Sequence, residues 1–117
     1  MDIDVRQNED VVIVDFHGRL AIGVSDEVFP TLIERLLDEG NKKLLLNLSD
    51  VDYIDSNGLG QLVAALKSAR RYGASMRLLN PQDRVRKTLR LTNLLPMFQT
   101  HDSEPDALTA FANQNGG

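Results

Sequence analysis

The sequence has no cysteine and no tryptophan, and aromatic residues make up only 5% of its 117 residues. Without cysteine, disulfides, thiol catalysis and cysteine-ligated metal sites are excluded. The scarcity of aromatic rings predicts an aliphatic core and leaves little surface on which bases could stack. A formal net charge of -4 provides no attraction to nucleic acid or to anionic membranes. We therefore expect neither nucleic acid nor a membrane among the partners.

Long apolar runs are also missing. No run approaches the roughly 20 residues that a membrane-spanning helix needs. The first ten residues are acidic and polar, unlike a secretory signal peptide. These features predict a cytoplasmic protein. The length suits one compact domain over residues 1–117, with a frayed tail at about residues 113–117.

Hydrophobic periodicity divides the chain into alternating strands and helices. Two segments around the polar turn Gln7–Asp10 predict a hairpin, with its second strand interrupted at Gly18. Ser25 and Asp26 are candidate caps for a first helix, which Gly40 ends. Strands are expected at residues 3–6, 11–16, 44–48 and 75–79, with a short edge strand at 97–100. Helices are expected from about residue 28 to Gly40 and at residues 57–72, 81–91 and 106–112.

This order of elements predicts an α/β fold. Strands linked through helices pair in parallel with right-handed crossovers, whereas the opening hairpin adds an antiparallel pair. We expect a mixed, mostly parallel central sheet of four to five strands, covered by about four helices.

The most informative segment runs from Asp50 to Gly60, between the end of a buried strand and the start of a helix. Open α/β sheets commonly place binding sites at such positions. Asp55, Ser56 and Asn57 could each cap the helix, but only one of them can hold the cap. Two glycines in the first turn lower helix propensity by about 1 kcal/mol each and leave little bulk over the Ser56 hydroxyl. On composition alone, a plain capping loop remains an alternative.

The run YIDSNGLG from Tyr53 to Gly60 resembles the signature of STAS domains, the family of sulfate-transporter C-terminal domains and anti-sigma-factor antagonists. The likeness extends along the chain. Residues 45–51 resemble the strand that leads into the motif, and Gly18–Leu20 resembles the turn after the hairpin. Residues 80–81 and 91–94 resemble the late helix and its exit. The resemblance implies the STAS fold for the α/β arrangement.

The resemblance further implies a phosphorylation switch at Ser56. Unphosphorylated relatives bind an anti-sigma factor of the histidine-kinase-like ATPase type and so free the sigma factor. That kinase phosphorylates the serine and abolishes binding, and a PP2C-type phosphatase resets the switch. The chain itself would have no catalytic activity and no cofactor. The partner-binding residues implied for this sequence are Arg19, Ala21, Asp52, Asp55, Ser56, Asn57, Gly58 and Leu59.

Two positions depart from the family pattern. Asn57 replaces a second hydroxyl residue, which leaves Ser56 as the only phosphoacceptor of that pair. Ala21 stands where the family often has aspartate, in a turn that lies near the phosphorylated serine in the family fold. These departures keep the switch but bear on which partner is bound.

Other constellations support less specific interpretations. Asp50, Asp52 and Asp55 miss the calcium-loop spacing, because Ile54 occupies the third ligand position and no glutamate closes the loop. Aspartates after a buried strand also occur in phosphotransferases, but this sequence lacks the lysine-bearing motif that would accompany them. We therefore expect no metal and no catalysis.

The remaining charged residues also suggest structural roles. His17 and His101 are far apart in sequence, and His17 is interpreted as the end of a strand. The basic run Arg84 to Arg90 is expected to be a solvated helix face. Two alternative functions stay open. The same phospho-switch could control an output other than a sigma factor, or the chain could be a STAS subunit of a transport complex in which Ser56 only caps a helix.

Overall fold

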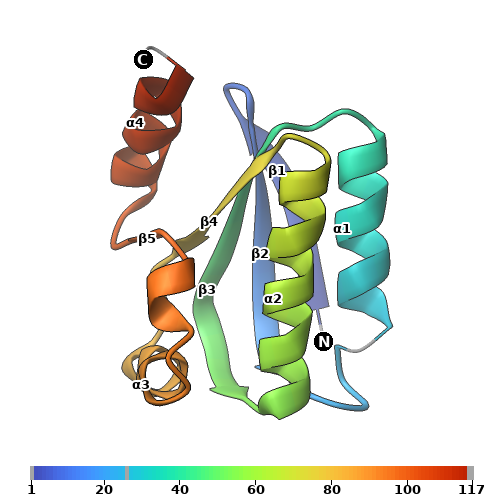
Figure 1. Cartoon of the computed structure of the whole chain (residues 1–117), viewed down its shortest axis with the longest axis vertical. Helices are drawn as coiled ribbons and strands as arrows, with labels where there is room; N and C mark the ends of the chain where they lie inside the picture. The colour runs from blue at the N-terminus through green and yellow to red at the C-terminus, as the bar shows by residue number, and fades with distance from the viewer. Residues whose placement is uncertain (1, 26, 116–117) are drawn as a thin grey trace.

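The computed structural model describes residues 2–25 and 27–115, and within them five strands form one sheet. Helices pack on both faces of this sheet (Figure 1). The strands are β1 (Asp2–Asn8), β2 (Val11–Leu20), β3 (Lys43–Ile54), β4 (Ser75–Leu79) and β5 (Thr100–His101). The helices are α1 (Val28–Asp38), α2 (Ser56–Arg71), α3 (Asp83–Leu91) and α4 (Glu104–Asn115), with a 3₁₀ turn, η1, at Leu95–Met97.

The strand order is β1-β2-β3-β4-β5. β1 and β2 pair antiparallel, and the three following pairs are parallel. The predicted fold class is therefore confirmed: a mixed, mostly parallel sheet with an opening hairpin. No helix of the described residues is long and apolar enough to cross a membrane.

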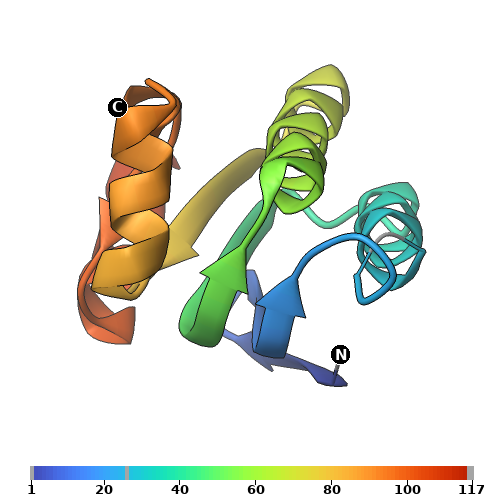
Figure 2. The same ribbon diagram turned by 90° about the horizontal axis from the view of Figure 1, so that it is seen from below.

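Strand alternation separates two apolar layers. Val12, Val14 and Phe16 face the side of α1 and α2, where Phe16 stacks on Phe29 with ring centroids 5.0 Å apart. Residues of the opposite parity, such as Ile13, pack with α4 on the other face. Figures 1 and 2 show α1 and α2 side by side, with α3 and α4 toward the other edge of the sheet. The sheet is thus covered most fully on the α1–α2 side.

Two strands are longer than the sequence predicts. β2 does not stop at Gly18; this glycine adopts a φ of +122° at a shift of register, and the strand continues to Leu20. β3 extends to Ile54, because the added end of β2 gives it a partner: Leu20 pairs with Ile54. Half of the informative segment is consequently strand rather than loop.

Several boundaries near the other elements also differ. Ser25 does not cap α1, because its buried hydroxyl bonds elsewhere, and the N-cap position is Glu27 without a side-chain bond. Asp26 lies outside the described residues. α3 begins two residues after Pro81.

The short edge strand predicted at 97–100 is present but displaced, because residue 97 belongs to η1 and β5 starts at Thr100. Residues 113–115 belong to α4 rather than to a frayed tail, and residues 116–117 lie outside the described residues.

Candidate functional site

The structure brings all eight predicted partner-binding residues to the carboxyl end of the sheet. They lie at the carboxyl ends of β2 and β3 and in the first turn of α2, at the bottom of Figure 1. The two strands are parallel, so their carboxyl ends meet, and Arg19 pairs directly with Tyr53. The candidate site is therefore one continuous region.

Asp55 is the residue that caps α2. Its backbone is extended (φ −104°, ψ −176°), and its Oδ1 accepts a hydrogen bond from the Gly58 N–H at 2.8 Å. Its Oδ2 accepts a second bond from the Ile22 N–H at 3.1 Å, across to the loop after β2. The Gly58 N–H, with smaller contributions from the Ile22 and Asn57 amides, lowers the pKa of Asp55 below its ordinary value. Asp55 is therefore ionised at neutral pH and fixed in place.

Asn57 belongs to a series of hydrogen bonds that links side chains of α2 to the loop after β2. Its Oδ1 accepts from Gln61 Nε2 at 2.7 Å, and Gln61 Oε1 accepts from the Ser25 hydroxyl at 2.9 Å. The Ser25 Oγ in turn accepts from the Ala21 N–H at 3.0 Å. Ser25 and Gln61 are buried, so this series ties the loop after β2 to the first turns of α2.

Ser56 differs from both of its neighbours. It is the first residue of α2 and is exposed, and no hydrogen bond recorded for residues 2–25 and 27–115 involves its hydroxyl. One turn later, a Cβ added at Gly60 would meet nothing within 4 Å. Ser56 also borders a mostly apolar hollow of about 420 Å³ that includes Leu59, Val63 and Leu94, with Lys67 at its rim. The hydroxyl is therefore accessible to another molecule.

The sequence suggested that Gly58 keeps the Ser56 hydroxyl accessible, but in the structure it allows close packing of α2 against β2. A Cβ at this position would lie 2.0 Å from the Leu20 carbonyl oxygen and 2.6 Å from its carbon. Only glycine lets α2 approach the end of β2 so closely. Gly58 therefore sets the packing of the helix on the strand, whereas the space near Ser56 is at Gly60.

The eight predicted site residues differ in burial: three are buried, Asp55 is half-buried and four are exposed. Ala21, Gly58 and Leu59 are buried and support the region from within. The exposed members are Arg19, Asp52, Ser56 and Asn57. Sequence reasoning missed two exposed apolar side chains beside them, Ile22 at 67% exposure and Tyr53 at 43%. The available signal for Ile22 was its place next to Gly23, in the turn after β2.

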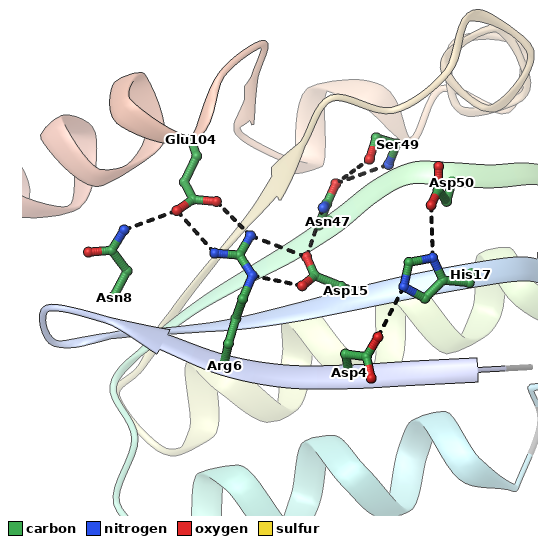
Figure 3. A network of polar contacts seen from close by, with 9 residues as sticks. All are labelled: Asp4, Arg6, Asn8, Asp15, His17, Asn47, Ser49, Asp50 and Glu104. Carbon is green, nitrogen blue, oxygen red and sulfur yellow. Dashed lines mark hydrogen bonds and ion pairs between the residues drawn. The ribbon is translucent and has the colours of Figure 1, made fainter.

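The nearby carboxylates do not converge on one point. Asp50 Oδ2 lies 2.8 Å from His17 Nδ1, and the other ring nitrogen of His17 lies 3.3 Å from Asp4 Oδ2 (Figure 3). The contact with Asp50, followed by that with Asp4, raises the pKa of His17 above its ordinary value. His17 lies within β2 and links three strands rather than ending one. Among the described residues there is no cluster of three side chains suited to a metal ion.

A second polar network on the α4 side of the sheet is centred on Arg6. Its guanidinium contacts Asp15 at 2.7 Å and Glu104 at 2.6 Å, and Asn8 also donates to Glu104 (Figure 3). The bond to Glu104, then the bond to Asp15, raises the pKa of Arg6. Burial alone would raise the pKa of Asp15, but bonds from Arg6 and Asn47 lower it overall. This network joins the hairpin to α4 and leaves the Arg6 charge fully compensated.

The basic run on α3 is largely solvated. Arg84, Lys87 and Arg90 are exposed, whereas Arg86 is half-buried and approaches Asp102 at 3.5 Å. None of these four basic residues lines the hollow beside Ser56.

Comparison with known proteins identifies the family. The STAS domain family model matches residues 2–107. A candidate anti-sigma factor antagonist of Thermotoga neapolitana is 37% identical over 100 residues, which cover 86% of this chain and 88% of that protein. The anti-sigma-B factor antagonist of Bacillus subtilis strain 168 is 33% identical over 96 residues, covering 80% and 84%. The crystal structure of a candidate anti-sigma factor antagonist from Thermotoga maritima superposes with a TM-score of 0.80 at 29% identity, over 92% of each chain. The chain belongs to the STAS domain family.

Proposed function

We propose that this chain is an anti-sigma-factor antagonist, a binding module without catalytic activity that is switched by phosphorylation of Ser56. The observation that carries the proposal is the exposed Ser56 hydroxyl, which has no internal partner in the described chain. Its neighbours Asp55 and Asn57 are both held by hydrogen bonds. The names of relatives that are 33% and 37% identical support the class of partner.

The chain's part in the reaction is to present a serine oxygen. An anti-sigma kinase of the histidine-kinase-like ATPase type would hold ATP. Ser56 Oγ attacks the γ-phosphorus, ADP leaves, and the hydroxyl proton passes to a base on the kinase. Asp55 is a weak base for that task, since the backbone N–H groups bonded to its oxygens lower its pKa. A PP2C-type phosphatase reverses the modification by hydrolysis.

The effect of phosphate follows from charge at an exposed position. A phosphoserine carries about -1.5 to -2 charges at neutral pH, and here it would stand beside ionised Asp55 and near Asp52. The Gly58 and Ile22 amides are already bonded to Asp55 and are not available to the phosphate. The group would thus remain at the surface, and the buried bonds would be unchanged. A docked partner would have to desolvate a dianion, so binding weakens.

The surroundings of Ser56 have the features of a contact surface. Ile22, Tyr53 and the hollow along α2 supply apolar area near the serine. Arg19 and Asp52 supply charged groups around it. An apolar centre with a polar rim is the usual composition of a reversible protein interface. We propose that the unphosphorylated chain docks the anti-sigma factor through this surface and thereby frees the sigma factor.

Binding measurements on three variants test the proposal. Calorimetry with the cognate anti-sigma kinase should give Ser56→Ala the affinity of the wild type, and Ser56→Asp an affinity lower by roughly tenfold or more. Thr109→Asp adds the same charge at an exposed position on α4 and should bind like the wild type. The proposal fails if Ser56→Asp binds as tightly as Ser56→Ala.

A further inference from the structure

Arg77, in β4, is a cation without a counter-ion among the described residues. Its Nη2 donates to Gln114 Oε1 at 2.9 Å, its Nη1 lies 3.0 Å from His101 Nε2, and its guanidinium packs 5.1 Å from the centre of the Phe111 ring. Its Nε is buried and has no hydrogen-bond partner in the described structure. None of the ion pairs among residues 2–25 and 27–115 includes Arg77.

This arrangement is electrostatically incomplete. Arginine stays protonated at any physiological pH, so the side chain cannot relieve the cost of burial by losing its proton. Burial is what lowers the pKa of Arg77, with no carboxylate to oppose it. Arg6, on the same sheet, shows the usual solution, because two carboxylates surround it. An anion close to Arg77 would supply what the chain itself lacks.

A hollow of about 280 Å³ adjoins this arginine. Its polar lining consists of Arg70, Ser75, Arg77, Gln99 and Gln114, with no aspartate or glutamate from residues 2–25 and 27–115. Arg70 is exposed, and its side chain forms no hydrogen bond or ion pair that the structure records for the described residues. Two arginines and two amide side chains therefore line one small space, in which Gln114 Nε2 donates to the Ser75 hydroxyl at 2.6 Å.

The edge of β4 adds a backbone donor to the same place. β5 pairs only with Leu78 and Leu79, so the first half of β4 has a free edge. The N–H groups of Leu78 and Asn80 point to that side, where they donate to the Gln99 and His101 carbonyls. By strand alternation, the Met76 N–H faces the same side, and Met76 also lines the hollow.

We propose that this hollow binds a small oxyanion, a phosphate or a carboxylate group, between the guanidinium groups of Arg77 and Arg70. Planar guanidinium donors match both oxyanions, and apolar side chains such as Leu66 leave room for a small attached group. The site lies at the amino end of β4, at the opposite end of the sheet from Ser56. It is therefore separate from the phosphorylation switch and does not depend on it.

Nuclear magnetic resonance titration tests the site directly. Sodium phosphate and sodium acetate are added separately at constant ionic strength, balanced with sodium chloride, and the Arg77 Nε–H and Met76 amide signals are followed. We expect saturable shifts with at least one anion, and the tighter of the two identifies the ligand as phosphoryl or carboxylate. Shifts that do not saturate with either anion would overturn the proposal.

Two variants assign the binding to these arginines. Arg70→Gln should weaken it roughly tenfold, the usual loss for one charge-assisted contact. Arg84→Gln removes the same charge from an exposed position on α3, outside the hollow, and should leave it unchanged. Equal affinity in the two variants would contradict the assignment.

Replacing Gln114 provides a test that leaves Arg77 in place. Gln114→Glu puts a carboxylate where the amide oxygen now accepts from Arg77 Nη2. We expect this variant to melt at a higher temperature than the wild type without added anion, and to lose the response to phosphate and acetate. A variant that still binds the anion with wild-type affinity would speak against the site.

Discussion

The two ends of the sheet differ in how far their polar side chains are paired within the chain. At the carboxyl end, Asp55 and Asn57 are engaged in hydrogen bonds within the chain, and the Ser56 hydroxyl is left exposed. At the amino end, within the part of the chain that the structure describes, Arg77 retains a buried N–H without a partner and a charge without a counter-ion. At the first end, the side chains that flank Ser56 are already satisfied within the chain, and the serine hydroxyl is the group left exposed. The second is incomplete, and a bound ligand could complete it.

The difference also concerns rigidity. The loop after β2 is tied to α2 by the bond from Ile22 to Asp55 and by the chain from Ala21 through Ser25 and Gln61. A phosphate on Ser56 would therefore change the charge of a fixed surface. At the other end, the contact of Arg77 with Gln114 helps to hold α4, so an anion there would act on the docking of a helix.

The largest effect is expected from the close packing at the carboxyl end. Gly58→Ala places a Cβ 2.0 Å from the Leu20 carbonyl oxygen, and we expect a loss of roughly 3 kcal/mol or more in the free energy of unfolding. Gly60→Ala is the matched control, because its Cβ meets nothing, and it should gain up to about 1 kcal/mol. Urea denaturation measures both. Equal stability of the two variants would show that α2 does not approach β2 as described.

The contrast between Asp55 and Ser56 predicts the next largest effect. Asp55→Ala removes the cap of α2 and the tether to Ile22 and should cost about 1–2 kcal/mol of unfolding free energy. Ser56→Ala removes a hydroxyl that has no hydrogen bond within the described residues, and it should change the free energy of unfolding by less than about 0.5 kcal/mol. Asp55→Asn keeps an acceptor for the Gly58 N–H and should fall between them. If Ser56→Ala proves as destabilising as Asp55→Ala, the serine has a structural role and the contrast is lost.

The exposed apolar residues near Ser56 should matter for the partner rather than for stability. Tyr53→Ala should weaken binding of the anti-sigma kinase by about 1 kcal/mol or more, which is roughly fivefold, with little change in melting temperature. Val5→Ala truncates a similarly exposed apolar side chain on β1, and its affinity should stay at the wild-type value. Calorimetry measures both affinities. If they fall equally in the two variants, Tyr53 is not part of the kinase-binding surface.

The smallest expected effects are those of the two histidines. The contact with Asp50 raises the pKa of His17, so its stabilising contribution is present at low pH and is lost as pH rises through its folded-state pKa. Burial, with Arg77 second, lowers the pKa of His101, so its contribution is present at high pH and is lost as pH falls through its folded-state value. Resonance titration of the imidazole protons measures both values. Asp50→Asn should lower the pKa of His17 alone, and phosphate bound at Arg77 should raise that of His101 alone.

Most of the fold follows from local sequence signals. Alternation and 3.6-residue periodicity predict four of the five strands and all four helices, and Gly40 and Gly73 end their helices with positive φ, as expected. The ends of β2 and β3 could not be predicted in this way. Each extends only because the other provides a partner across the irregular register at Gly18, and that is a tertiary effect.

The candidate site was predictable as a segment but not as a set of roles. Three adjacent residues could cap α2, and the choice of Asp55 depends on the Ile22 N–H from a loop 33 positions away. The requirement for glycine at position 58 depends on Leu20 in the same way. The Arg77 hollow left no sequence signal at all, because its lining comes from α2, β4, α4 and the segment before β5. An isolated arginine in a strand does not reveal that it lacks a counter-ion.

The central claim is that Ser56 is the phosphorylated switch, and mass spectrometry of the phosphorylated chain tests it most directly. The wild-type chain is incubated with its cognate anti-sigma kinase and ATP, with Ser56→Ala as the parallel sample. We predict a gain of one phosphate, about 80 Da, that maps to Ser56 in the wild type and is absent from the variant. An unmodified wild-type chain in the presence of a kinase that binds it, or a phosphate mapped to another residue, would contradict the account.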